Sequence, residues 1–107
     1  MIIPIRKPKK KKSEETILLN AVRDFFRWNL WKVIRFQQGL GSHPGIPDLC
    51  IMRDGIFAWI EIKTPKGKMS EAQIAFESDC LDANINHHIV RSFDDAIKIN
   101  KFYLMKT

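Results

Sequence analysis

The stretch GIPDLCIMRDGIFAWIEIK, residues 45–63, decides the fold, because two apolar runs flank the pair Asp54-Gly55. Asp-Gly between two such runs is a strong signal for a β-hairpin with a two-residue turn. Residues of the two strands then pair outward from the turn. In that register Asp48 lies directly opposite Glu61, so the hairpin brings together two carboxylates that are far apart in the sequence.

Two directly opposed carboxylates repel each other, because their Cβ atoms are roughly 4.5–5.5 Å apart. Lys63 shares the strand face of Glu61, but one ammonium group cannot neutralise two carboxylates. A divalent cation can, and Mg²⁺ prefers hard oxygen ligands, with water and substrate phosphate in its other positions. These residues therefore predict a metal site. Two simpler interpretations stay open: Asp48 as a turn residue after Pro47, and Glu61 with Lys63 as a surface ion pair.

The chain outside the hairpin alternates between helical and strand patterns. Ser13 is a good helix N-cap, and Ser70 with Gln73 forms a capping-box pattern. The predicted elements are a helix over 14–29, strands over 33–38, 48–52 and 56–63, a helix over 71–83, a strand over 85–91, and a helix over 93–105. This order, α-β-β-β-α-β-α, predicts an α/β domain with mixed helices and strands.

The positive charge is concentrated at the N-terminus. Of 18 basic residues, six lie in residues 1–12, MIIPIRKPKKKK, which contain no acid, and the remaining 12 balance 12 acidic residues. We therefore expect a flexible tail over 1–12 and one domain over 13–107. Lys9, Lys10, Lys11 and Lys12 are candidates to contact nucleic-acid phosphates, although a solubilising tail is the alternative.

Several protein classes do not fit the composition. No apolar run is long enough to span a bilayer, and the N-terminus has no apolar signal-peptide region. Cys50 and Cys80 lack the spacing of a zinc site, and we expect both to be buried free thiols in a reducing cytoplasm.

Several motifs together resemble one nuclease family. Pro47-Asp48 followed by Glu61-Ile62-Lys63 resembles the PD-(D/E)xK motif. GIPDL, EIKTPKGKMSEAQ and SEETI resemble the corresponding segments of the virus-type replication-repair nuclease (VRR-NUC) domain, over about residues 13–99. The resemblance implies a restriction-endonuclease-like core, in which helices flank a central mixed sheet. The short chain resembles stand-alone members from bacteriophages, which would place the protein in the host cytoplasm.

The resemblance also implies roles for individual residues. Asp48, Glu61 and the backbone carbonyl of Ile62 would bind Mg²⁺ or Mn²⁺, and Lys63 would orient or deprotonate the attacking water. Gln73 would support Lys63 or the phosphate by hydrogen bonding, in addition to its capping role.

The family also places a glutamate of the first helix near the metal. We expect Glu14, because Ile17, Leu18, Ala21 and Phe25 follow it at helical spacing, with Glu15 as the alternative. Either acid can instead stabilise the helix dipole alone.

The implied substrate is DNA, with Arg35 and His43 as further candidate contacts. Stand-alone members of the family resemble Holliday-junction resolvases, so the resemblance implies a homodimer acting on four-way junctions. The apolar segment FFRWNLW is a candidate dimer surface. Two alternatives remain: a nuclease directed to flaps or nicks, and a non-catalytic nucleic-acid-binding protein with the same fold.

Overall fold

The computed structural model describes residues 13–105, and the basic tail predicted over 1–12 lies outside them. The order of elements is the predicted α-β-β-β-α-β-α. The elements are α1 (Glu14–Trp28), β1 (Lys32–Arg35), β2 (Leu49–Arg53), β3 (Ile56–Ile62), α2 (Glu71–Asp82), β4 (Asn86–Val90) and α3 (Phe93–Leu104).

The hairpin forms in the predicted register. Its strands, β2 and β3, are antiparallel, with Arg53 opposite Ile56 and Leu49 opposite Ile60. Asp54 and Gly55 both have positive φ angles, 48° and 81°, as a two-residue turn of type I′ requires. The turn chemistry and the apolar pattern therefore specify the same pairing.

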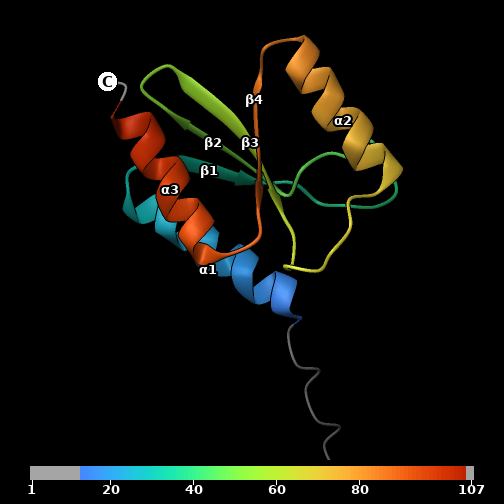
Figure 1. The fold of residues 1–107 in the computed structure, drawn as a ribbon, viewed down its shortest axis with the longest axis horizontal. Helices are drawn as coiled ribbons and strands as arrows, with labels where there is room; N and C mark the ends of the chain where they lie inside the picture. The colour runs from blue at the N-terminus through green and yellow to red at the C-terminus, as the bar shows by residue number, and fades with distance from the viewer. Residues whose placement is uncertain (1–12, 106–107) are drawn as a thin grey trace, which may run out of the picture.

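The four strands form one mixed sheet in the order β1-β2-β3-β4. β1 is antiparallel to β2, whereas β4 is parallel to β3 and follows it through α2. Figure 1 shows α1 and α3 together on one face of the sheet and α2 alone on the other. β3 is therefore an interior strand covered on both faces, as its nearly continuous apolar sequence predicts.

The main core lies between the sheet and the pair α1 and α3. It consists of apolar side chains from these elements and from Trp31: Leu19, Val22, Phe26, Trp31, Val33, Leu49, Ile51, Ala58, Ile60, Ile62, Val90, Ala96, Ile99 and Tyr103. The other face of the sheet carries a smaller aromatic contact, in which the rings of Trp59 and Phe76 lie 5.3 Å apart. The two cysteines are free and buried, as predicted.

Helix boundaries follow the predicted caps closely, whereas β1 is shorter than predicted. Ser13 and Ser70 cap α1 and α2, and α2 has the complete capping box. The prediction of a strand over 33–38 was too long. Past Arg35 the chain turns away from regular pairing, although the Phe36 N–H still donates to the Asp48 carbonyl at 2.9 Å.

Gly45 lets the loop before β2 approach the first turn of α2. Its φ is +76°, and a Cβ there would lie 2.1 Å from the carbonyl oxygen of Ala72. Gly41 has a similar φ of +88° but open space around it. The two glycines thus form a matched pair, in which only Gly45 combines a left-handed backbone with close contact.

We expect Gly45→Ala to destabilise the protein by about 2–5 kcal/mol, since it adds a clash to the left-handed strain. Gly41→Ala carries only the strain, about 1–2 kcal/mol. Urea denaturation of both variants checks this expectation, and equal losses of unfolding free energy would contradict the role given to the Gly45–Ala72 contact.

Candidate functional site

Asp48 and Glu61 lie together at one end of the sheet, one pair beyond the last ladder partners Leu49 and Ile60. Asp48 precedes β2, and its Oδ2 accepts a hydrogen bond of 2.8 Å from the backbone N–H of Ile62. Both side chains are buried, Asp48 at 8 % exposure and Glu61 at 1 %. The hairpin thus holds two acids side by side and away from bulk water.

This arrangement disfavours the charged form of Glu61. Burial, followed by the negative charge of Asp48, raises the pKa of Glu61 from 4.5 to about 9. The positive charge of Lys63 opposes the shift, and the negative charge of Glu15 adds to it. Without a further positive charge, Glu61 is therefore a neutral acid at pH 7.

Glu61 has one oxygen that the protein does not satisfy. Its Oε1 accepts a hydrogen bond of 3.1 Å from Gln73 Nε2, whereas Oε2 is buried and accepts no hydrogen bond, so the ionised form of Glu61 leaves this oxygen without a donor beside Asp48. A buried acceptor without a partner is costly, and a cation bound between Glu61 and Asp48 would remove that cost. The donor set thus fits a divalent cation.

Few protein ligands are available for such an ion. Within residues 13–105, no group of three or more His, Cys, Asp and Glu side chains is arranged to hold a metal. Two carboxylates suit Mg²⁺, which usually keeps several waters and binds substrate phosphate. The Ile62 backbone adjoins both acids, since it follows Glu61 and donates to Asp48.

Gln73 combines its capping role with a contact to the site. Its Oε1 accepts from the Ser70 N–H at 2.9 Å, and its Nε2 donates to Glu61. The contact with Glu61 was not among the expected ones, and the expected support of Lys63 or the phosphate stays a prediction. One side chain thereby fixes the start of α2 against the candidate metal ligand.

Glu15, and not Glu14, faces the site. α1 buries Leu19, Val22 and Phe26, which follow Glu15 at +4, +7 and +11. Glu15 is half-buried and acts electrostatically on Glu61, whereas Glu14 is exposed. The preference for Glu14 was wrong because it assigned Ile17 to the buried stripe, and Ile17 is 57 % exposed.

Lys63 follows directly after β3. Its backbone N–H donates to the Val90 carbonyl at 3.0 Å, which extends the pairing of β3 and β4 by one bond. The side chain is partly exposed, and its charge favours the ionised form of Glu61. Lys63 therefore stands beside the two acids with access to solvent.

The predicted DNA contacts are separated in the structure. Arg35 lines a cavity of about 550 Å³ together with Phe36, Gln37, Gln38 and Asp48, so it shares this cavity with one of the two acids. His43 is exposed and packs edge-on against Phe76 on α2, with ring centroids 5.8 Å apart. Lys9, Lys10, Lys11 and Lys12 lie outside the described residues.

Arg91, which stands between β4 and α3, was not among the predicted site residues. Its Nη1 donates to the carbonyl oxygens of Thr64 at 2.8 Å, Gly67 at 2.7 Å and Pro65 at 3.4 Å. No local pattern in the sequence predicts these contacts, since Arg91 is more than 20 residues from its partners. The guanidinium group joins the end of β4 to the loop after Lys63.

The raised pKa of Glu61 predicts how stability depends on pH when metal is absent. Between pH 4.5 and 9 the unfolded chain releases this proton and the folded chain keeps it, so stability decreases as pH rises through this range. Glu61→Gln removes this contribution. In EDTA we expect the Tm of the natural protein to fall more steeply from pH 5 to pH 9 than that of Glu61→Gln.

Thermal denaturation at several pH values measures both curves. Parallel curves would contradict the buried, protonated state of Glu61. Mg²⁺ at pH 8 should raise the Tm of the natural protein and leave that of Glu61→Gln nearly unchanged, because an ion that binds only the folded state stabilises it.

Comparisons with known proteins identify the family. The model of the VRR-NUC domain matches residues 7–94. A solved VRR-NUC domain is 20 % identical and superposes with a TM-score of 0.74, over 86 % of this chain and 99 % of that one, a likeness that concerns the fold alone. No curated protein matches the sequence. The chain belongs to the VRR-NUC domain family, which makes it a nuclease domain of the PD-(D/E)xK type.

Proposed function

We propose that this protein is a Mg²⁺- or Mn²⁺-dependent DNA endonuclease that recognises DNA structure and acts as a Holliday-junction resolvase. The observation that carries the proposal is the buried pair Asp48 and Glu61, with one unsatisfied carboxylate oxygen and Lys63 beside it. A buried pair of acids that can ionise together only against mutual repulsion is costly as a purely structural feature. It becomes favourable once a divalent cation binds.

Asp48, Glu61 and the carbonyl oxygen of Ile62 are the proposed metal ligands. The bound ion would polarise the scissile phosphate and lower the pKa of a coordinated water. Lys63 orients that water and stabilises the negative charge that develops on the phosphate. Gln73 orients Glu61 through its hydrogen bond of 3.1 Å, and Glu15 completes the acidic side of the site.

DNA would reach this site along basic groups. Arg35 lines the same cavity as Asp48, which supports a contact of Arg35 with a phosphate beside the scissile one. Lys9 to Lys12 would hold more distant phosphates, and His43 is a peripheral contact. No helix in the described part of the chain is long and apolar enough to cross a membrane. The proposed place of action is the cytoplasm of the host of a bacteriophage.

A homodimer would match the two-fold symmetry of a four-way junction. The segment FFRWNLW supports a dimer because its apolar residues divide into two groups. Phe26 and Trp31 are buried at 0 % and 3 % exposure, whereas Trp28 and Leu30 are 88 % and 78 % exposed. Large exposed apolar groups that lie together are typical of an association surface.

Two other functions remain to be distinguished by experiment. A nuclease for flaps or nicked duplexes would use the same metal site without a requirement for a dimer. A non-catalytic DNA-binding protein would not need Lys63 beside the acid pair. The chemically complete set Asp48, Glu61 and Lys63 favours catalysis over binding alone.

We expect paired, symmetric cuts in a labelled four-way junction with Mg²⁺ or Mn²⁺ and none with EDTA. Asp48→Asn and Lys63→Ala should each reduce the cleavage rate by about 100-fold or more, because each removes stabilisation of the charged transition state. Lys63→Ala should still bind the junction. Gel analysis of cleavage on junction, duplex, flap and single-stranded DNA provides the measurement.

Sedimentation of the protein alone and with the junction is the matching control. Cleavage without junction preference, or a monomer both alone and with the junction, would exclude a resolvase. Either result would still be consistent with a nuclease. Tight binding without cleavage in either metal would exclude the nuclease.

Glu15 and Glu14 allow a matched test of the first helix. Glu15→Gln should lower the cleavage rate and also lower the pKa of Glu61, since the charge of Glu15 raises that pKa. Glu14→Gln changes the same charge at an exposed neighbour and should leave both quantities nearly unchanged. Cleavage rates measured from pH 6 to pH 9 compare the variants, and equal effects of the two substitutions would contradict the assignment of Glu15 rather than Glu14 to the site.

A further inference from the structure

The loop after β3 begins and ends beside the same carboxylate. It starts at Lys63, two residues after Glu61, and reaches α2, where Gln73 donates to Glu61 Oε1 at 3.1 Å. The loop over residues 63–70 is therefore held at both ends against the candidate metal site. The side chains that it exposes therefore lie within a few residues, along the chain, of Glu61 or Gln73.

The middle of this loop is a tight turn over residues 64–67, and the Arg91 side chain donates hydrogen bonds to its backbone carbonyls. The Gly67 N–H donates to the Thr64 carbonyl at 3.0 Å, and Pro65 occupies the second position, where its fixed φ suits such a turn. A Cβ at Gly67 would lie 2.9 Å from Thr64 Oγ1, so the turn closes tightly. The Arg91 contacts with the carbonyls of Thr64, Pro65 and Gly67 satisfy its inner side.

Arg91 is itself anchored to α3. Its backbone N–H donates to Asp95 Oδ2 at 2.9 Å, and Asp95 lies in the first turn of that helix. The turn over 64–67 is thus connected through Arg91 to the rigid part of the fold. This is more support than a surface connection between a strand and a helix needs.

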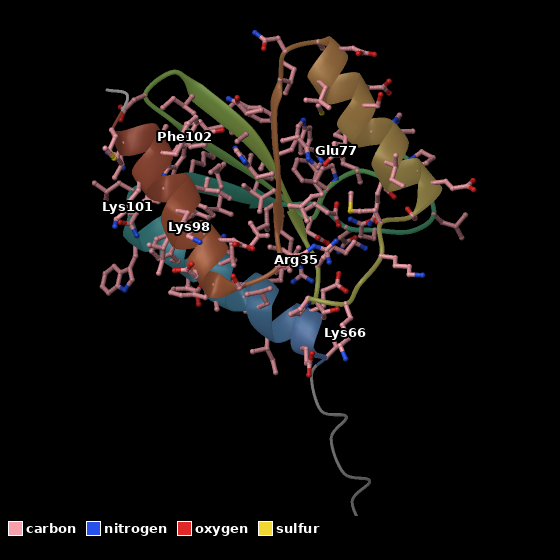
Figure 2. All side chains as sticks on the ribbon, in the orientation of Figure 1. Arg35, Lys66, Glu77, Lys98, Lys101 and Phe102 are labelled. Atoms are coloured by element: carbon pink, nitrogen blue, oxygen red, sulfur yellow. The ribbon has the colours of Figure 1, made fainter. Side chains whose placement is uncertain are left out.

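The turn and the residue that follows it expose two positively charged side chains. Lys66 and Lys68 are exposed, and within residues 13–105 neither forms a salt bridge. The loop over 63–70 contains three lysines and no acid. Figure 2 shows Lys66 at the end of the molecule where α1 begins, whereas Lys98 and Lys101 lie on α3.

We infer that the turn over 64–67 and the adjacent Lys68 form a preformed phosphate-binding element, in which Lys66 and Lys68 contact two DNA phosphates flanking the cut and Arg91 is the positioning residue. This inference rests on the proposed nuclease function and assigns it a substrate contact. Holding the lysines in place before binding avoids the loss of loop entropy on binding. Arg91 cannot itself bind phosphate through Nη1, because that group donates inward to three carbonyls.

Equilibrium binding in EDTA tests the inference without cleavage. The full chain and its variants are titrated against a fluorescein-labelled four-way junction and a linear duplex, from 50 to 200 mM salt. Lys66→Ala/Lys68→Ala should weaken binding about 10-fold at low salt. It should also reduce the slope of log Kd against log salt by about 1.8, since each lost phosphate contact removes about 0.9.

Lys98→Ala/Lys101→Ala is the matched control, because it removes the same charge from α3. Lys98 forms a surface salt bridge of 3.1 Å with Asp94, and such pairs contribute little to stability. We expect this control to keep both affinity and slope. Equal behaviour of the two double variants would overturn the inference, because net charge alone would then explain binding.

Arg91→Lys separates position from charge. A lysine keeps the charge but cannot bridge three carbonyls with a planar group, so binding should weaken at least threefold with an unchanged salt slope. A folded Arg91→Lys protein that binds like the natural one would overturn the positioning role. Should this variant not fold, Pro65→Gly loosens the same turn with Arg91 and both lysines intact, and it carries the same expectation.

Cleavage of the junction with Mg²⁺, measured in parallel, separates this inference from the proposed function. The natural protein could cleave no DNA while the Lys66→Ala/Lys68→Ala variant still binds more weakly than it does. That result would contradict the nuclease function and support the phosphate-binding element. Normal cleavage and binding by that variant would contradict only the proposed phosphate-binding element. A natural protein that binds neither DNA would overturn both.

Discussion

Asp48 and Glu61, two buried carboxyl groups that would repel each other if both were ionised, are held together by the pairing of β2 with β3. The hydrogen bond from the Ile62 N–H to Asp48 Oδ2 fixes one acid against the strand that carries the other. Covering β3 on both faces makes the strand rigid enough to support this arrangement. Burial and the negative charge of Asp48 keep Glu61 neutral, and a bound cation would instead stabilise its ionised form.

The surrounding elements are arranged around that pair. Gln73 connects the start of α2 to Glu61, and Glu15 brings the start of α1 to the same end of the sheet. α2 packs on the sheet with Phe76 and buries Cys80, and Gln73 and the close approach at Gly45 fix its amino end. The contact of Gln73 with Glu61 therefore positions both α2 and the candidate site.

The hairpin, the order of elements and the helix starts were predictable because each depends on neighbouring residues. Asp54-Gly55 selects one turn type, and the turn sets the register that places Asp48 opposite Glu61. Ser13 and Ser70 supply the hydrogen bonds that start α1 and α2. The strand over 33–38 was predicted too long because apolar alternation continues past the point where β1 leaves the sheet.

By itself, the sequence determined the hairpin, its register and therefore the meeting of Asp48, Glu61 and Lys63, since a two-residue turn allows only one pairing. Only the tertiary structure decided which acid of α1 faces them. Ile17 is as apolar as Leu19, and the packing of α1 against the sheet and α3 buries one and exposes the other. The contact of Gln73 with Glu61 and the contacts of Arg91 with residues 64–67 likewise join distant segments, so no local pattern encodes them.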